Sequence, residues 1–381
     1  MTIYFVAGEV SADNHGAALM RSLRELDPGL TFIGRGGPQM QEIAGKQFKN
    51  WIGDAAVLGL WEVLRKYGYF REQFRETLKE ILENKPDTVV LIDYPGFNLR
   101  LARALRRQSR RQKIIYYISP QVWAWNRGRI KRMARFVDLV LCIFPFEADL
   151  YNQVGLRAVF VGHPTIERLR VRKIDTERDP NLIGLFPGSR SREVRKIFPV
   201  MLETARKLQK HNRTLRFEVA AASAELTREM SPTTAGLDQS QHRQAIQIKL
   251  DETAAIMQRA WAGIVASGSA TLEAAYFRLP FVLIYKVAWP TYLAARLVVN
   301  VKYLGMPNLL ADKEVVPEFI QYRAKPKAIV KALRSLMEDA DGRARMISEF
   351  DALVGKLGEG GASERAARAI IEEIGRSNET T

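Results

Sequence analysis

The sequence predicts an α/β protein made of two doubly wound domains, each built around a parallel β-sheet. The chain has 381 residues, too many for one ordinary core and suited to two domains of roughly 150 to 200 residues. In both halves, short β-rich runs alternate with longer helical patterns, which is typical of βαβ units on a parallel sheet. Several runs end in a small-residue turn that opens a helix, as expected at the ligand-binding edge of such sheets.

The N-terminal half contains six expected strands, at residues 3–7, 32–34, 88–92, 114–118, 138–143 and 158–161. The first run ends within a few residues and no basic leader precedes it, so we expect a buried strand rather than a signal peptide. Nowhere do about 18 uncharged apolar residues follow one another, so we expect no membrane-spanning helix. These features predict a cytoplasmic protein, or one on the cytoplasmic face of a membrane.

A charged, proline-bounded stretch at residues 168–179 is either the linker between two domains or a solvated helix. Further strands are expected at residues 182–186, 216–221, 262–266 and 281–285. From residue 325 the sequence favours helices, and a glycine-rich turn at 358–361 precedes a last helix over 363–374. We expect one domain at residues 1–165 plus about 350–381, and the other at 166–349.

Composition limits the chemical class of the binding partner but does not identify the partner. A hydrophobic content of 47% supports folded cores and argues against a disordered chain. The net charge of +16 calls for an anionic partner, which is a nucleic acid, an anionic lipid or a phosphorylated substrate. Much of the positive charge lies in two clusters of the N-terminal half, at residues 100–113 and 127–135.

The sequence offers little for metal chemistry. Cys142 is the only cysteine, so an intrachain disulfide or cysteine cluster is excluded, and its apolar neighbours indicate a core residue. The four histidines lack the spacing of metal ligands. Asp339 and Asp341 have the Asp-x-Asp spacing of some metal sites, but a polar, glycine-ended turn around them indicates a solvated loop. We expect no metal and no cofactor.

One strand-to-helix turn of the second half suits a phosphate. Gly188, Ser189 and Arg190 follow the expected strand at 182–186. Free backbone N–H groups at the start of a helix bind phosphate, and Arg190 can add a bidentate contact to a diphosphate. Such turns also occur for packing alone, so this turn by itself leaves both interpretations open.

A second turn of the same kind follows the strand at 262–266. Ser269 and Thr271 offer hydroxyls there, and Glu273 lies one turn into the helix. A carboxylate at that place either accepts both hydroxyls of a ribose or caps the helix. The two turns together predict a nucleotide diphosphate pocket.

The first half places polar residues at corresponding turns. Glu9, Ser11 and Asp13 follow the first strand, where helix capping is the alternative role for Ser11 and Asp13. Asp93 stands at the carboxyl end of the apolar strand at 88–92, a position that usually faces a ligand cleft, with a cap or turn as the alternative. These residues are candidates for contact with a substrate.

A series of nine motifs, in order along the chain, resembles the lipid-A-disaccharide synthase family. Together they are far more specific than any one motif. They are Ala7-Gly-Glu-Val-Ser-Ala-Asp13, Gly36-Gly-Pro38, Ile92-Asp93 with Phe97-Asn98, Ser119-Pro-Gln-Val-Trp-Ala-Trp125, Phe144-Pro-Phe-Glu147, Val161-Gly-His-Pro164, Pro187-Gly-Ser-Arg190, Ser267-Gly-Ser-Ala-Thr-Leu-Glu273 and Pro307-Asn-Leu-Leu310.

The resemblance implies the GT-B fold, in which two Rossmann-like domains face a cleft and the last helix crosses back to the first domain. It implies a glycosyltransferase whose C-terminal domain binds the UDP-sugar and whose N-terminal domain meets acceptor and membrane. The implied reaction transfers 2,3-diacylglucosamine from UDP-2,3-diacylglucosamine to 2,3-diacylglucosamine 1-phosphate with inversion. A β-1,6 disaccharide 1-phosphate forms and UDP leaves.

The resemblance also implies residue roles. Arg190, with Gly188 and Ser189, is expected to bind the diphosphate. Ser269 and Thr271 are also expected to contact the phosphates, and Glu273 is expected to bind the ribose. Asn308 matches a family position near the nucleotide.

For the first domain, the resemblance implies a general base, with Asp93 as first choice and Asp13 as second. Glu9, Ser11 and Asn98 are expected in the same pocket. Ala12 stands where the family usually has glycine. If that glycine served a positive φ, alanine would cost about 1 kcal/mol; an ordinary φ would remove the cost.

Both implied substrates carry acyl chains, so we expect an apolar surface bordered by basic residues. The candidate contains Trp61, Leu64, Arg65 and Tyr67, which fit an interfacial amphipathic helix or a buried core helix equally well. Residues 289–304 are a second candidate. We expect a peripheral protein at an anionic membrane surface, on the cytoplasmic face of the inner membrane, and leave a monomer or a homodimer open.

Two other interpretations compete. UDP-N-acetylglucosamine 2-epimerases share the two-domain architecture, but their soluble sugars leave the arginine-rich, aromatic first half unexplained. A nucleic-acid-binding protein would use the positive charge, but the sequence lacks a helix-turn-helix, zinc or RNA-binding signature and would have no use for two nucleotide turns. We expect no nucleic-acid partner.

Overall fold

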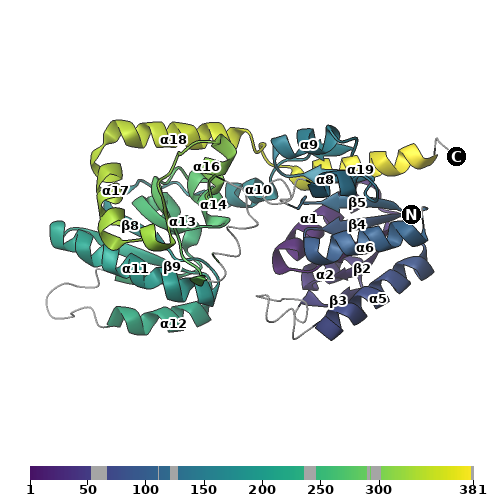
Figure 1. The fold of residues 1–381 in the computed structure, drawn as a ribbon, viewed down its shortest axis with the longest axis horizontal. Helices are drawn as coiled ribbons and strands as arrows, with labels where there is room; N and C mark the ends of the chain where they lie inside the picture. Colours follow the sequence, from purple (N-terminus) through teal and green to yellow (C-terminus); the bar gives the residue numbers. More distant parts are fainter. Residues whose placement is uncertain are drawn as a thin grey trace. The chain divides into compact units, whose positions relative to one another are not determined.

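The computed structural model describes residues 1–52, 67–109, 111–120, 128–235, 246–289, 292 and 302–378. The chain divides into two compact units. Unit 1 comprises Met1–Glu167 and Leu357–Thr381, and unit 2 comprises Arg168–Lys356. Each unit is an α/β structure with one parallel sheet, which confirms the predicted fold class (Figure 1).

Unit 1 contains a seven-stranded parallel sheet in the order β3-β2-β1-β4-β5-β6-β7. Its strands are β1 (Thr2–Ala7), β2 (Thr31–Gly36), β3 (Phe48–Asn50), β4 (Thr88–Ile92), β5 (Lys113–Tyr117), β6 (Leu139–Cys142) and β7 (Ala158–Phe160). After their first residues, Thr2, Thr88 and Lys113, the central strands β1, β4 and β5 are hydrophobic, because helices cover both faces of the sheet. The sequence did not predict β3, whose three residues form an edge strand.

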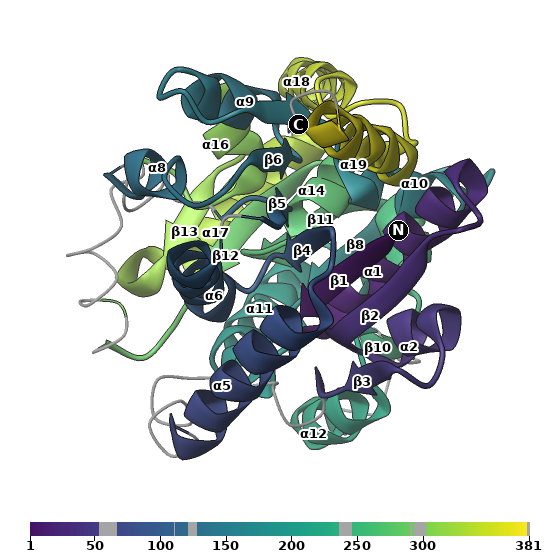
Figure 2. The ribbon, with the colours of Figure 1, turned by 90° about the vertical axis from the view of Figure 1, so that its right-hand side faces the viewer.

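Two groups of helices cover the sheet of unit 1. They are α1 (Val10–Leu26), α2 (Pro38–Ala44), α5 (Tyr67–Asn84), α6 (Pro95–Gln108), α8 (Gly128–Met133), α9 (Pro145–Asn152) and α19 (Ala362–Asn378), while α10 (Pro164–Arg170) contains the boundary between the two units. Alternate strand residues face opposite sides. One core joins the sheet to α5, α6 and α9 and includes Cys142, and the other joins it to α1, α2 and α19. Figure 2 shows α5 and α6 on one side of this sheet and α1 and α19 on the other.

The C-terminal helix α19 belongs to unit 1, as the resemblance implied. Ala366, Ala367 and Ile370 are buried in the core that α19 shares with α1. The carboxylate of Glu373 pairs with Lys113 at 3.1 Å and also with Arg157. These ion pairs attach the end of the chain to the start of β5 and to the segment before β7.

Unit 2 contains a six-stranded parallel sheet in the order β10-β9-β8-β11-β12-β13. Its strands are β8 (Asp179–Phe186), β9 (Arg216–Ala221), β10 (Ile246–Leu250), β11 (Ala260–Ala266), β12 (Phe281–Tyr285) and β13 (Glu318–Ile320). Its helices are α11 (Ser191–His211), α12 (Ala224–Ala235), α13 (Thr253–Arg259), α14 (Ala270–Tyr276), α16 (Met306–Ala311), α17 (Pro326–Glu338) and α18 (Ala340–Gly355), with a 3₁₀ turn at Gln321–Arg323. The edge strands β10 and β13 were not predicted.

Each sheet has one point where the chain reverses its direction of travel across the strands. In unit 1 this point lies between β1 and β4, and in unit 2 between β8 and β11. The turns that follow these strand pairs therefore lie next to each other, which is where doubly wound sheets bind ligands. Among the described residues, no helix is both long enough and apolar enough to cross a membrane.

Candidate active site

The turns after β1 and β4 meet in unit 1. Ala7 and Ile92 are paired at the ends of these strands. A Cβ atom placed on Gly8 would lie 2.4 Å from the ring of Tyr94, so only glycine permits this approach. Glu9 and Asp93 are the carboxylates that follow on the two turns, and the reversal point brings them together.

Asp93 has a backbone conformation that its neighbours enforce. Asp93 and Tyr94 both have positive φ angles, of 46° and 49°. The side-chain amide of Asn98 donates to the Asp93 carbonyl at 2.8 Å, and the Tyr116 hydroxyl donates to the same carbonyl at 2.6 Å. The amide of Asp93 donates to the Tyr117 carbonyl at 3.0 Å. Left-handed non-glycine residues persist only where such contacts hold them.

Asn98 and Tyr116 therefore act on the backbone of this turn. Asn98, expected in the pocket, is fully buried and also donates to the Ile92 carbonyl at 3.2 Å. Tyr116 could not be predicted from the sequence, because a tyrosine inside an apolar strand gives no indication of the partner of its hydroxyl. Both residues fix the direction in which the Asp93 side chain leaves the strand.

The environment of Asp93 makes its carboxyl group a weaker acid. Burial, and next the negative charge of Glu9, raise the pKa of Asp93 to about 6. A hydrogen bond from the Tyr94 backbone acts in the opposite direction. A carboxylate with this pKa is ionised at neutral pH and is also a better proton acceptor than an ordinary one.

Asp13, the second candidate base, has a carboxylate that contacts the start of α2. One carboxylate oxygen accepts the amides of Gly37 at 2.9 Å and Met40 at 3.0 Å, and the other accepts the amide of Gln39 at 3.0 Å. The side chain is buried and caps the N-terminus of α2. Helix capping was the alternative role predicted for Asp13 from the sequence. Asp13 lies in α1, however, and the helix that it caps is α2.

The rest of the first turn is open to solvent. Glu9 is the N-cap residue of α1, and Glu9 and Ser11 are both exposed. Ala12 lies inside α1 and is not among the residues with positive φ. The replacement of the family's glycine by Ala12 therefore introduces no left-handed residue.

The turns after β8 and β11 meet in unit 2. Phe186 and Val265 are paired near the ends of these strands. A Cβ atom placed on Gly188, whose φ is 103°, would lie 3.7 Å from the Cβ of Ala266. Gly268 has a φ of 143°, and a Cβ there would meet no atom within 4 Å. The space in front of Gly268 is therefore open, whereas Ala266 and the Glu193 carboxylate, the latter at 3.8 Å, border the space in front of Gly188.

Arg190 and two serines lie on these two turns. Arg190 is the N-cap residue of the long helix α11, and its exposed guanidinium lies 3.2 Å from the Glu193 carboxylate. Ser189 and Ser269 are also exposed. The α11 N-terminus and Arg190 supply the amide groups and the charge that a diphosphate requires.

Thr271, expected at the phosphates, has a hydroxyl that makes contacts within the protein. This residue is fully buried, and its hydroxyl donates to the Gly268 carbonyl at 2.8 Å. The same oxygen accepts the amide of Met306 at 3.4 Å. Thr271 thus fixes the glycine turn and connects it to α16, because a hydroxyl in the first helical turn reaches its own turn more easily than a ligand.

Asn308 is likewise buried and fully engaged. Its amide nitrogen donates to the Val316 carbonyl and the Glu318 carboxylate, at 2.8 and 2.9 Å. Its oxygen accepts the amides of Val315 and Val316, at 2.7 and 2.8 Å. Asn308 therefore uses its whole side-chain amide to hold the segment between α16 and β13 in place.

Glu273 remains a candidate for direct contact. Its side chain is 13% exposed and lies 2.8 Å from the Arg168 guanidinium. Burial raises the pKa of Glu273, and the charges of Arg168 and Arg172 lower it, with a net increase. The sequence could not pair Glu273 with Arg168, since 105 positions separate them.

The expected membrane contacts are not part of the described structure. Trp61, Leu64 and Arg65 lie outside the described residues. Tyr67 begins α5, and its side chain is also outside them. The second candidate, residues 289–304, is described only at 289, 292 and 302–304.

Comparison with known proteins gives one consistent family. A family model for lipid-A-disaccharide synthetase matches residues 3–369. The lipid-A-disaccharide synthase of Geobacter sulfurreducens is 39% identical and covers 98% of this chain and 97% of its own. That of Myxococcus xanthus is 34% identical, with 97% of both chains covered.

Solved structures are similar in fold alone. The UDP-GlcNAc 2-epimerase from Neisseria meningitidis, bound to UDP-GlcNAc, has a TM-score of 0.61 at 13% identity and covers 97% of this chain and 99% of its own. MurG of Acinetobacter baumannii has a TM-score of 0.57 at 12% identity, with 97% and 99% covered. The two parallel sheets are those of the GT-B fold.

Proposed function

The chain belongs to the lipid-A-disaccharide synthase family, and from this premise we propose the substrates, roles and location that follow. It is a glycosyltransferase that uses a UDP-sugar donor and a lipid acceptor. We propose transfer of 2,3-diacylglucosamine from UDP-2,3-diacylglucosamine to 2,3-diacylglucosamine 1-phosphate, with release of UDP. The family match over residues 3–369 carries this proposal. The epimerase alternative has only a likeness of fold at 13% identity.

The donor site in unit 2 binds UDP through groups that are now paired with each other. The amides at the α11 N-terminus and the Arg190 guanidinium hold the diphosphate. On binding, Arg190 leaves its ion pair with Glu193 and pairs with the diphosphate. Ser269 adds a hydroxyl, and the Glu273 carboxylate accepts the ribose hydroxyls. Positive charge at the diphosphate stabilises UDP as it leaves. Thr271 and Asn308 keep the turns in shape without contacting the ligand.

Asp93 is the general base of unit 1. Its carboxylate takes the proton from the acceptor hydroxyl as the oxygen attacks the anomeric carbon, and the bond to UDP breaks on the opposite face. The raised pKa of about 6 supports this role. Glu9 and Ser11 border the same turn and are available to the sugar hydroxyls.

We expect kcat/KM to fall tenfold per pH unit below about pH 6, because protonated Asp93 cannot accept a proton. In Glu9→Gln the midpoint should move to lower pH, since the lost negative charge no longer raises the pKa of Asp93. Burial is the larger cause, so part of the increase should remain. The measurement is a pH–rate profile of both proteins beside Glu25→Gln, an exposed residue at the far end of α1. An unchanged midpoint in Glu9→Gln would disprove the coupling.

The donor site is tested with purified protein, both acylated substrates and detergent, by following UDP release together with disaccharide formation in a mass spectrometer. Arg190→Ala and Glu273→Ala should each weaken UDP binding about 10- to 100-fold, the range for a hydrogen bond to a charged group. Arg213→Ala, an exposed arginine elsewhere in unit 2, should behave as the parent. If the parent protein binds UDP but forms no disaccharide, the acceptor must be a different molecule. If the parent protein does not bind UDP, the proposed glycosyltransferase activity is excluded.

The acylated substrates require contact with a lipid surface. We propose that the protein is peripheral at the cytoplasmic face of the inner membrane, where its net charge of +16 favours anionic lipid. A homodimer is compatible with this location. Sedimentation with vesicles and light scattering test the two statements separately.

A further inference from the structure

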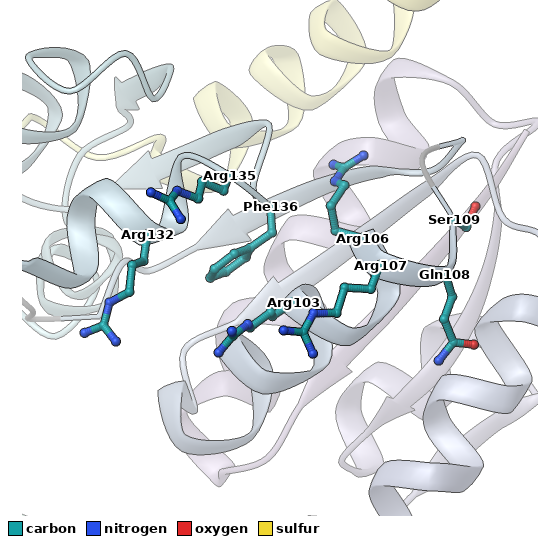
Figure 3. Close-up of a pocket in the computed structure, with 8 residues that line it drawn as sticks. All are labelled: Arg103, Arg106, Arg107, Gln108, Ser109, Arg132, Arg135 and Phe136. Atoms are coloured by element: carbon teal, nitrogen blue, oxygen red, sulfur yellow. The ribbon is translucent and has the colours of Figure 1, made fainter.

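Unit 1 contains a cavity of about 420 Å³ between the end of α6 and the segment that leads from α8 to β6. Five arginines and one phenylalanine dominate its lining: Arg103, Arg106, Arg107, Arg132, Arg135 and Phe136. Figure 3 shows the Phe136 ring between Arg103 on one side and Arg132 and Arg135 on the other. None of the proposed substrate contacts uses these residues.

One of the five arginines is already neutralised. The Arg106 guanidinium pairs with the Asp138 carboxylate, and in Figure 3 it points away from the other guanidinium groups. Arg103, Arg107, Arg132 and Arg135 are exposed, and none has a carboxylate partner within the described part of the chain. The described lining residues include no acidic side chain. Four like charges around one hollow repel each other unless an anion lies among them.

The cavity is remote from Asp93. α6 begins directly after β4 and runs back across the sheet, so its last turns lie near the amino ends of the strands. Asp138 confirms this position, because its carboxylate accepts the amide of Ile114 at the start of β5, at 2.7 Å. A helix of 14 residues is about 21 Å long. An anion in the cavity would therefore lie near the amino ends of the strands, whereas the proposed base Asp93 lies at the carboxyl end of β4.

A basic strip on α6 extends this surface. Arg100, Arg103 and Arg107 are exposed and spaced three and four residues apart, so they share one face of the helix. Arginines near a helix C-terminus also interact favourably with its dipole. The favourable interaction with the helix dipole explains why arginines lie in the last turns of α6 and α8. It does not explain why side chains from these two segments line the same cavity.

We propose that this cavity binds a phosphate group that is not part of the reacting substrates. The planar guanidinium groups of Arg103, Arg107 and Arg132 can form paired hydrogen bonds to phosphate oxygens. The Phe136 ring supplies an apolar wall beside them. The phosphate belongs either to the headgroup of an acidic lipid or to a soluble phosphoanion. This inference goes beyond the proposed function and does not depend on turnover.

The test compares Arg103→Gln/Arg107→Gln/Arg132→Gln with Arg21→Gln/Arg213→Gln/Arg228→Gln, which removes the same charge from exposed arginines elsewhere. One arm measures binding to phosphatidylcholine vesicles with and without phosphatidylglycerol, and the other measures inorganic pyrophosphate by calorimetry at the same ionic strength. The cavity variant should lose about 100-fold in affinity, about fivefold for each arginine. Arg103→Gln alone should lose about fivefold.

The two arms distinguish the source of the phosphate. A selective loss with phosphatidylglycerol vesicles assigns the cavity to a lipid headgroup, and a selective loss with pyrophosphate assigns it to a soluble anion. Equal weakening in both triple variants, or no binding of either probe by the parent, would overturn the proposal. Turnover in detergent should persist in the cavity variant, and its loss at an unchanged unfolding temperature would also overturn it, by placing the cavity in the reacting site.

Discussion

Asp93→Asn should lower kcat about 1,000-fold, within the range of 100- to 10,000-fold for loss of a general base. The asparagine side chain has the same shape but cannot take the acceptor proton. Asparagine also tolerates a positive φ, so the strained turn at position 93 should remain intact. UDP affinity and the unfolding temperature should stay close to those of the parent. Initial rates at saturating donor, calorimetry with UDP and thermal unfolding measure the three quantities.

Glu9→Gln is the matched control for Asp93→Asn. It removes a carboxylate from the neighbouring turn while leaving Asp93 in place, so most of the turnover should survive at pH 8, where Asp93 is ionised in both proteins. Full activity of Asp93→Asn would show that another group takes the proton. Equal losses in both variants would indicate that the pair acts together.

The central part of both sheets could be predicted from the sequence, because strands covered on both faces are continuously apolar. β4, with the sequence Thr-Val-Val-Leu-Ile, is an example in which every residue is buried. The edge strands follow another rule. β10 reads Ile-Gln-Ile-Lys-Leu and is half exposed, and β3 and β13 have three residues each. Short or half-polar strands form only because a neighbouring strand offers free hydrogen-bonding groups, which local sequence does not record.

The strand-to-helix turns that carry the candidate residues could also be predicted, but the contacts of individual side chains could not. A strand that runs into a glycine turn is a local pattern, and both such turns lie where the patterns placed them. Asp13, by contrast, receives amides from residues 24 to 27 positions away. Asn308 is engaged by a segment that doubles back on it. The family resemblance identifies such residues as important without separating those that touch ligand from those that hold the turn.

The arginine-lined cavity could not be predicted from the distribution of charge along the sequence. The sequence places two basic clusters at residues 100–113 and 127–135, and a solvated helix face would explain each. Only the fold brings the end of α6 beside the segment before β6 and pairs Arg106 with Asp138. The remaining arginines then surround one hollow, which two separate charge clusters do not predict.

Asp13→Ala should destabilise unit 1 by roughly 3 to 5 kcal/mol, because it leaves the amides of Gly37, Gln39 and Met40 without their acceptor. This is a large share of the 5 to 15 kcal/mol that typically stabilises a domain. Asp13→Asn should cost less than alanine, since one oxygen can still accept while the new NH₂ group faces backbone donors. Urea unfolding of both variants measures the loss.

The comparison with Asp93→Asn separates positioning from catalysis. If Asp13 only caps α2, the urea midpoint of Asp13→Asn should fall, while the turnover of the molecules that remain folded stays within a few-fold of the parent. A general base behaves in the opposite way: kcat falls and the midpoint does not. A thousand-fold loss of kcat in Asp13→Asn at an unchanged midpoint would therefore return Asp13 to the role of base. The three amide contacts argue against that result, because the lone pairs that accept these amides are not available to an acceptor hydroxyl.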